Sequence, residues 1–166
     1  MLYKVGNNDL HCISIKFPMK KILSFYFLSL FLNPGAFCQF AKDSVAIVKL
    51  LEKESLTWRS GDIKGHAECW AMKPYSRILV STSEGSVYDV APAIMLNPGT
   101  DMVGNGGTSV NSNYKMSIHG TDAWVSYDEV STNKEDKKTY SYEMKILEKI
   151  EGEWKLVGQS IHIYKP

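Results

Sequence analysis

The chain has 166 residues, with 19 basic and 18 acidic side chains and a formal net charge of +1. Arg59 and Arg77 are its only arginines and no stretch is strongly basic, which argues against a nucleic-acid partner, because such proteins present a basic surface. The length is enough for one compact domain with a substantial core and too short for two.

Residues 19–38 have the pattern of a secretory signal peptide. Two lysines follow Met19, residues 22–32 are mostly apolar, and small side chains precede Gln39 at the positions that signal peptidase reads. The apolar run is shorter than the roughly 20 residues that a membrane-spanning helix needs, so the pattern favours export over a stable membrane span. We expect cleavage near Cys38 and Gln39, and a periplasmic or extracellular mature protein.

The N-terminal region also has alternative interpretations. Residues 1–18 carry no signal pattern, so they are an upstream extension or an artefact of the choice of start site. Residues 19–38 are alternatively a buried amphipathic helix of a cytosolic domain, although their polar side chains do not gather on one face. Lipid attachment to Cys38 is disfavoured by the bulky Phe37, because that signal requires a small residue there.

The predicted mature chain, residues 39–166, keeps 15 basic and 17 acidic residues, a net charge of −2. Cys69 is its only cysteine, so it has no partner for an internal disulfide, and its place beside Trp70 in a predicted helix favours a small buried hydrophobe. One thiol and three histidines are too few for a structural zinc site, and we expect neither a metal nor a cofactor.

The first part of the mature chain predicts two helices. Apolar residues recur at helical spacing from Val45 onward, and Asp43 before them is a suitable cap, which indicates an amphipathic helix of about four turns. Gly61 ends this helix, and Asp62 begins a second one that runs through Trp70. We expect the pair to form a helical hairpin at the front of the domain.

From residue 75 onward the sequence predicts strands separated by turns. Residues 77–80 read as a short strand, and residues 85–95 are ambiguous because Pro92 limits any helix. Residues 97–113, rich in Gly, Asn, Ser and Thr, are predicted to be a loop. Two hairpins follow, with strands at residues 114–118, 123–130, 139–150 and 154–164 and turns at residues 119–122, 131–138 and 151–152.

The last predicted strands carry apolar residues on both faces. In the final one, Val157 and Ile161 alternate with Trp154 and Leu156. Such strands lie inside a sheet that is covered on both faces. We expect the helices to cover one face and a second layer to cover the other, and a partner subunit can supply that layer. Helices followed by a run of strands predict an α+β domain.

The order of these segments resembles the nuclear transport factor 2-like superfamily, which includes the SnoaL-like proteins. Four segments carry the resemblance: residues 54–62 with their Gly-Asp pair, residues 69–71 with Cys-Trp, residues 118–125, and residues 146–157, which end in Glu-Trp-Lys-Leu-Val. The resemblance covers roughly residues 43–165, so residues 39–166 are expected to be a single domain. The chain also looks like small exported bacterial members of this superfamily.

The resemblance implies a cystatin-like cone, in which a strongly curved antiparallel sheet wraps around the N-terminal helices. It further implies a pocket at the open end of the cone and a homodimer formed through the outer face of the sheet. Relatives include isomerases, dehydratases, polyketide cyclases and proteins without a known reaction, so the fold does not determine the function.

Enzymes of this superfamily use a carboxylate base in the pocket, assisted by a donor to the oxyanion. The candidates here are Asp128, His162 and Tyr142. Trp124 and Asp128 point to one face of their predicted strand and Glu129 to the other. If the Trp124 face lines the cone, Asp128 and His162 can meet; otherwise Asp128 is a surface charge.

The aromatic residues indicate a binding surface more strongly than the acids do. Trp58, Trp70, Tyr75 and Trp124 are the candidate ligand-binding residues, although large rings are also common core residues. The remaining polar candidates have simpler interpretations: His66 as a polar helix position, and residues 119–122 as a turn. Residues 105–107 resemble a phosphate-binding loop only superficially and are expected to form a flexible rim.

Three functions are therefore compatible with the sequence. The leading one is an exported domain, noncatalytic or of uncharacterised catalysis, that binds a small apolar organic ligand and dimerises through its sheet. The alternatives are an isomerase, dehydratase or cyclase that uses a pocket carboxylate or histidine, and a protein-interaction module that dimerises.

Overall fold

The computed structural model describes residues 34–166. The predicted upstream extension, residues 1–18, and most of the predicted signal peptide, residues 19–38, lie outside the described part. Among the described residues, no helix combines the length and the apolar character needed to cross a membrane.

Two helices precede the sheet, as the sequence predicts, but their bounds differ from the prediction. Helix α1 spans Pro34–Ser60 and begins before Asp43, with a proline in its first turn, where the missing N–H is no loss. Helix α2 spans only Ile63–Ala67, and the Asp62 side chain caps it by accepting a hydrogen bond of 2.9 Å from the Gly65 backbone. Trp70 therefore lies beyond α2, whereas the sequence predicts that it lies within the second helix.

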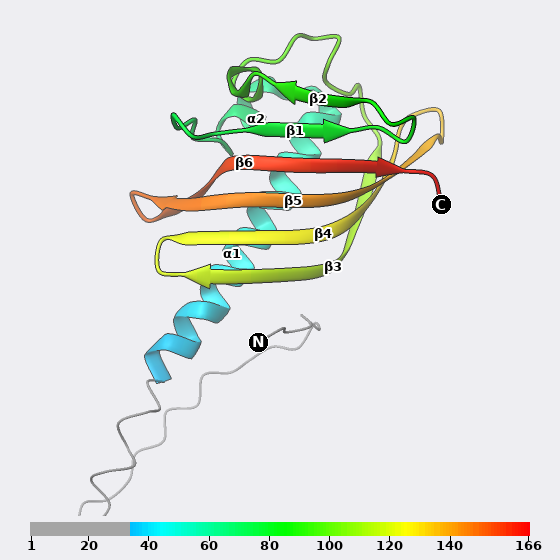
Figure 1. Cartoon of the computed structure of the whole chain (residues 1–166). Helices are drawn as coiled ribbons and strands as arrows, with labels where there is room; N and C mark the ends of the chain where they lie inside the picture. Colours follow the sequence, from blue (N-terminus) through cyan, green and yellow to red (C-terminus); the bar gives the residue numbers. More distant parts are fainter. Residues whose placement is uncertain (1–33) are drawn as a thin grey trace, which may run out of the picture.

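The strands form one six-stranded sheet in the order β2-β1-β6-β5-β4-β3 (Figure 1). All neighbouring strands are antiparallel except β1 and β6, which are parallel. The ambiguous segment 85–95 divides into β2 and the short 3₁₀ helix η1. The bounds are Ile78–Ser81 for β1, Val87–Val90 for β2, Pro92–Met95 for η1, Thr108–His119 for β3, Asp122–Thr132 for β4, Lys138–Ile150 for β5 and Glu153–Tyr164 for β6.

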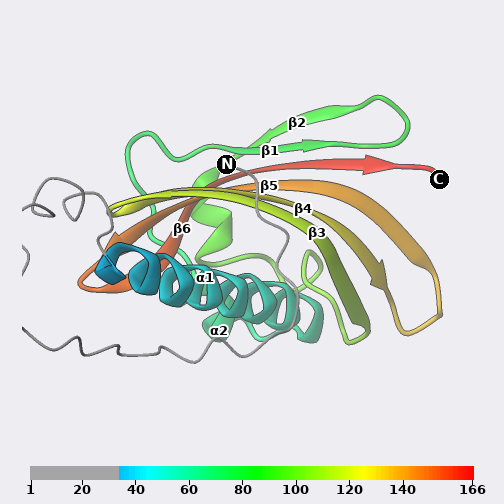
Figure 2. The same ribbon diagram turned by 90° about the horizontal axis from the view of Figure 1, so that it is seen from below.

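The sheet is strongly curved and arches over α1, which lies against its concave face (Figure 2). Irregularities in strand pairing occur between Ser112 and Lys115 in β3, and between Ile146 and Leu147 where β5 meets β6. Bulges of this kind increase the bend and twist of a strand. The structure thus confirms the α+β class and the curved sheet around a helix.

The core lies between α1 and the concave face. Ile47 and Leu51 of α1 are fully buried against Val125, Leu147 and Leu156 from the three central strands. Burying a side chain of this size contributes about 1.5 to 3 kcal/mol. This apolar contact fixes the position of the helix under the sheet and leaves the space beyond its C-terminal end less filled.

The prediction of a loop over residues 97–113 is wrong for its last part, because β3 begins at Thr108. The inward positions there are Ser109 and Asn111, which pair with Ser131 and Glu129 of β4. This half of β3 faces a polar region of the interior and needs no apolar alternation. The sequence therefore lacks the usual sign of a half-buried strand.

The apparent two-sided apolar pattern of the last strand comes from a bulge. Leu147 pairs with Leu156 while Ile146 pairs with Gly158, so Val157 is an extra residue in β6. An extra residue shifts the alternation by one position, and Leu156 and Ile161 therefore both face inward. The strand has one apolar face, so its sequence pattern does not require a second layer outside the sheet.

Candidate binding cavity

A cavity of about 840 Å³ lies between the C-terminal end of α1, the inner face of the sheet and the loop of residues 96–107. Exposed residues of the β4–β5 turn, such as Glu135 and Lys137, line its rim. Ligand-binding pockets commonly have volumes of roughly 300 to 1,000 Å³, so the space is sufficient for a small organic molecule.

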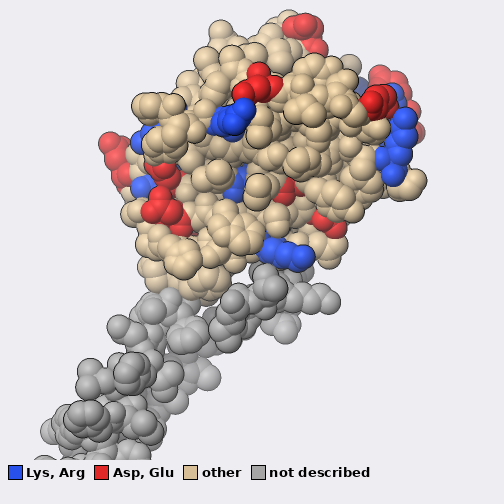
Figure 3. Space-filling view, viewed as in Figure 1, with Lys and Arg blue, Asp and Glu red and all other residues tan. Residues whose placement is uncertain are grey.

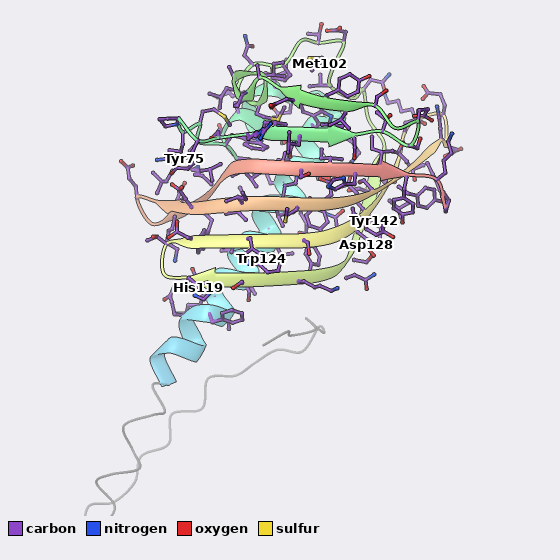
Figure 4. The ribbon with its side chains drawn as sticks, viewed as in Figure 1. Tyr75, Met102, His119, Trp124, Asp128 and Tyr142 are labelled. Atoms are coloured by element: carbon purple, nitrogen blue, oxygen red, sulfur yellow. The ribbon has the colours of Figure 1, made fainter. Side chains whose placement is uncertain are left out.

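One side of the cavity is apolar. It is formed where β1, β2 and β6 meet η1 and the end of α1. Met102 also lines it and belongs to the loop next to β2 (Figure 4). The apolar side chains that line it are Trp58, Ile78, Val80, Val90, Met95, Met102, Val103, Ile161 and Ile163. An apolar molecular surface of moderate size can be removed from water here.

The neighbouring part of the lining, on β5, is polar and centres on Lys145, which is only 2% exposed. Its Nζ lies 3.5 Å from Oε2 of Glu54 and 3.3 Å from Oε2 of Glu143, and donates a hydrogen bond to Oε1 of Gln159. Burial by itself would lower the pKa of Lys145, but the nearby carboxylates outweigh burial and raise it. Lys145 therefore remains a cation and is not a nucleophilic amine.

Glu143 is the member of this group whose hydrogen-bonding capacity is least used. Its Oε1 accepts a hydrogen bond of 2.8 Å from Ser141, whereas the buried Oε2 accepts none, even though Lys145 is near. Burial is the main reason why the pKa of Glu143 is raised; Lys145 opposes this shift, and Glu129 and Glu54 add to it. A buried carboxylate with a free acceptor atom is thus present in the cavity wall.

A second ion pair closes the wall toward β3. Nη1 of Arg59 donates to Oε1 of Glu129 at 2.7 Å, and Ser55 donates to Oε2 of the same carboxylate at 3.0 Å. Arg59 also donates to the hydroxyls of Ser55 and Ser109. Both ends of the pair are mostly buried, so the interaction is less screened than a surface salt bridge.

The loop at the rim is held by the end of α1. The backbone N–H groups of Gly104 and Gly106 donate to the carbonyls of Trp58 and Arg59 at 2.9 and 2.7 Å. A Cβ atom on Gly104 would lie 2.4 Å from the Arg59 carbonyl oxygen, so only glycine permits this approach. The segment 105–107 is therefore a rim of the cavity, bonded at Gly106 to the helix end.

The predicted ligand-binding residues do not share one location. Trp58 lines the cavity, and Trp70 lies in the core at 5% exposure. Tyr75 is in an exposed loop, where its hydroxyl donates to Glu148. Trp124 is 43% exposed on the outer face of the sheet, the face turned away from α1 (Figure 4).

The three catalytic candidates lie together, but outside the cavity. In the strand register Asp128 is opposite Tyr142, and Tyr142 is opposite His162, all on the outer face. Asp128 accepts a hydrogen bond of 2.5 Å from Asn113, and the His162 ring contacts Ser81 at 2.8 Å. Since the Trp124 face is the outer one, Asp128 is a surface charge and forms no pair with His162 inside the cone.

The polar residues that line the cavity were not among the sequence candidates. Glu143 and Lys145 share the strand parity of Leu147, which is fully buried, and this shared parity is the signal that places them inside. Glu129 likewise shares the parity of Val125. Their partners Glu54 and Arg59 are far away in the sequence, and no local pattern connects them.

His66 is not the polar helix position that we expected, because it is fully buried beside Trp58, with ring centroids 4.9 Å apart. Burial is the largest influence on the pKa of His66 and lowers it, which favours the neutral ring. Cys69 is also fully buried, and burial raises its pKa to about 11, so the thiol is unreactive. No cluster suitable for a metal ion occurs among residues 34–166.

No family model matches the chain, and no curated protein matches its sequence. A nuclear transport factor 2-like protein with a cystatin-like fold from Novosphingobium aromaticivorans has a TM-score of 0.60 at 14% identity, over 82% of this chain and 91% of that chain. A protein of unknown function with a cystatin-like fold from Nostoc punctiforme gives 0.57 at 19%, over 74% and 92%. A Silicibacter pomeroyi protein of unknown function, also nuclear transport factor 2-like, gives 0.58 at 14%, over 75% and 98%.

Identities this low establish the fold and leave the activity undetermined. The α+β class and the curved sheet around a helix agree with the cystatin-like fold that these structures have. The chain has the cystatin-like fold of nuclear transport factor 2-like proteins.

Proposed function

We propose that the protein binds a small organic molecule in the cavity, with the apolar body of the ligand against Trp58 and Ile161 and one polar group at Lys145 and Glu143. The observation that carries the proposal is the division of an 840 Å³ cavity into an apolar side and a polar side. Such a surface suits a molecule that is apolar over most of its area and polar at one end.

A fragment library tests this proposal. Small aromatic and aliphatic fragments are screened by ligand-observed NMR against the wild type and three variants that each introduce one tryptophan. Ile161→Trp fills the cavity, whereas Ile146→Trp adds the same ring on the outer face, where Ile146 is 51% exposed. Ser131→Trp places the ring in the cavity from β4 and serves as a second blocking variant.

We expect fragments to bind the wild type and Ile146→Trp and to lose at least tenfold in affinity for both blocking variants. Fragments that bind the blocked and unblocked proteins equally well would contradict the proposal. A library without any binder would also contradict it.

Proton transfer is the second candidate function, and Glu143 is the residue that favours it. A buried carboxylate whose pKa burial raises above its usual value is suited to act as a general base or acid. The test is the exchange of α-protons of cyclohexanone for deuterium, in which a base removes the proton and the electron pair moves into the enolate. Faster exchange with wild type than with Glu143→Gln supports catalysis, and equal rates contradict it.

Export and dimerisation complete the proposal. We propose that residues 19–38 direct export and that mature protein begins at Gln39, which N-terminal sequencing of the periplasmic fraction tests; a start other than Gln39 would contradict it. A homodimer through the outer sheet face is supported by Trp124, Tyr142 and Met144, which are 43 to 52% exposed there. Uncharged atoms cover most of the middle of this face (Figure 3).

A further inference from the structure

The buried charges around the cavity do not balance. Three carboxylates, those of Glu54, Glu129 and Glu143, face two cations, Arg59 and Lys145, and each of the five lines the cavity. Arg59 is paired with Glu129 at 2.7 Å, and Lys145 divides its charge between Glu54 and Glu143. When all five are ionised, the interior has one negative charge in excess.

The excess is located at Glu143. The residue is 6% exposed, and among the described residues its Oε2 is the one buried carboxylate oxygen that accepts no hydrogen bond, although Nζ of Lys145 lies 3.3 Å away. Leaving a buried acceptor unpaired is unfavourable, more so when it carries charge. A buried group of this kind in a native structure calls for an explanation, and a bound cation or hydrogen-bond donor is one that fits a cavity wall.

The groups that face Glu143 come from several elements. Glu54 approaches from α1, Tyr127 and Glu129 from β4, and Lys145 from β5. The β6 neighbour Gln159 is neutral and is bonded to Lys145. At the rim, Glu135 and Lys137 are both exposed and have opposite charges, so they leave the internal excess unchanged.

We propose that the ligand of the cavity carries an amine, and that its ammonium group pairs with the carboxylate of Glu143 while its apolar part lies against the neighbouring apolar residues of the lining. An ammonium supplies both a hydrogen-bond donor for Oε2 and the positive charge that the interior lacks. A ligand carboxylate would add a second excess negative charge, and a hydroxyl would supply the donor without the charge. The inference rests on the proposed function and specifies the chemical class of its ligand.

The test compares head groups on identical bodies. Indole, phenyl and cyclohexyl bodies are each used as an ethylamine, an ethanol and an acetate derivative, and affinities for the wild type are measured by calorimetry at pH 7.5. We expect each amine to bind at least tenfold more tightly than its alcohol, and the acetates to bind most weakly. Because all of these affinities are measured on the wild type, the result does not depend on whether a variant folds.

Two variants with the same change of charge locate the preference. Glu143→Gln keeps the shape of the side chain and is expected to reduce the preference for amines to less than threefold. Glu153→Gln removes one negative charge at an exposed site of β6 outside the cavity and is expected to leave the preference unchanged. Thermal unfolding of each variant checks that the fold is retained.

The outcomes separate the two proposals. Equal affinities for amines and alcohols, or a preference for acetates, would overturn the inference while binding in the cavity still supports the proposed function. An amine preference that survives in Glu143→Gln would also overturn the inference. Failure of every body and head group to bind would overturn both.

Discussion

Glu143 and Lys145 are separated by one residue on β5, and both side chains enter the cone, where Oε2 of Glu143 lies 3.3 Å from Nζ of Lys145. The same Nζ reaches Glu54 on α1, 91 positions earlier in the sequence. A single buried lysine therefore connects the helix to the sheet and sets the electrostatic environment of the cavity.

Replacing Lys145 should destabilise the fold strongly. Lys145→Met removes the cation and leaves the Glu54 and Glu143 carboxylates buried without it, which we expect to cost about 3 to 5 kcal/mol. Urea unfolding measures the loss, with Lys115→Met on the exposed side of β3 as the control. A loss no larger than that of the control would show that the cluster does not stabilise the protein.

Glu143 should make stability fall as the pH rises. Because its folded pKa is raised above 4.5, the folded state holds the proton more tightly than the unfolded state, so stability is greatest below that value and is lost as the pH passes the folded pKa. Glu143→Gln removes this loss. The free energy of unfolding of the variant minus that of the wild type should therefore increase from pH 4 to pH 8; a constant or decreasing difference contradicts the assignment.

Asp43 should stabilise the packing of α1 against the sheet. Its carboxylate accepts hydrogen bonds from Trp154 at 3.0 Å, Lys149 at 2.5 Å and Gln39 at 2.9 Å. We expect Asp43→Ala to cost about 3 kcal/mol, measured by urea unfolding, and the exposed Lys42→Ala to cost little. Equal losses for the two variants would mean that this contact is dispensable.

Asp43 also has a distinct pH signature. Burial acts to raise its pKa, but the hydrogen bonds from Lys149, Gln39 and Trp154 outweigh burial and lower it. The stabilisation is then present above the unfolded value near 3.8 and is lost as the pH falls through the lower folded pKa. The difference in free energy of unfolding between Asp43→Ala and the wild type should therefore shrink in strongly acidic solution, well below the unfolded pKa of 3.8.

Gly104 should be required for closure of the rim. In Gly104→Ala the new methyl group would meet the Arg59 carbonyl oxygen, so the loop must move away from the end of α1. We expect a loss of about 1 to 3 kcal/mol and faster hydrogen exchange at the amide of residue 104. Ser112→Ala, at an exposed site on β3, is the control, and equal exchange in the two variants contradicts the prediction.

The outer face should mediate dimerisation. Trp124→Glu places a charge in the middle of the proposed interface and is expected to convert a dimer into a monomer, as measured by light scattering after size-exclusion chromatography. Val45→Glu introduces the same charge on the exposed side of α1 and should leave the mass unchanged. A monomeric wild type, or a Trp124→Glu variant that remains dimeric, would refute the interface.

Much of the fold follows from local patterns in the sequence. The hairpins are predictable because strict alternation and turns such as Glu151-Gly152 mark where β5 ends and β6 begins. The start of β3 is not predictable from the sequence, because Ser109 and Asn111 face a polar interior and give no apolar alternation. The bulge at Val157 is also not predictable from the sequence, because the extra residue makes the strand look apolar on both faces.

The cavity residues are less predictable than the fold. Alternation correctly separates Trp124 and Asp128 from Glu129, but it does not state which side faces α1. The large indole of Trp124 suggests an inner position, while the structure places it outside. Glu143 and Lys145 look like ordinary strand surface charges, because the carboxylate that makes burial of Lys145 tolerable comes from Glu54 on a distant helix.

The location of a bound amine is the most direct test of the account. Protein with labelled isoleucine methyl groups is titrated with tryptamine and observed by NMR. Ile161 and Ile163 line the cavity, whereas Ile146 is on the outer face. The account predicts ligand contacts and shifted signals at Ile161 and Ile163 with none at Ile146; contacts at Ile146 instead, or no shifts at any of the three, would contradict it.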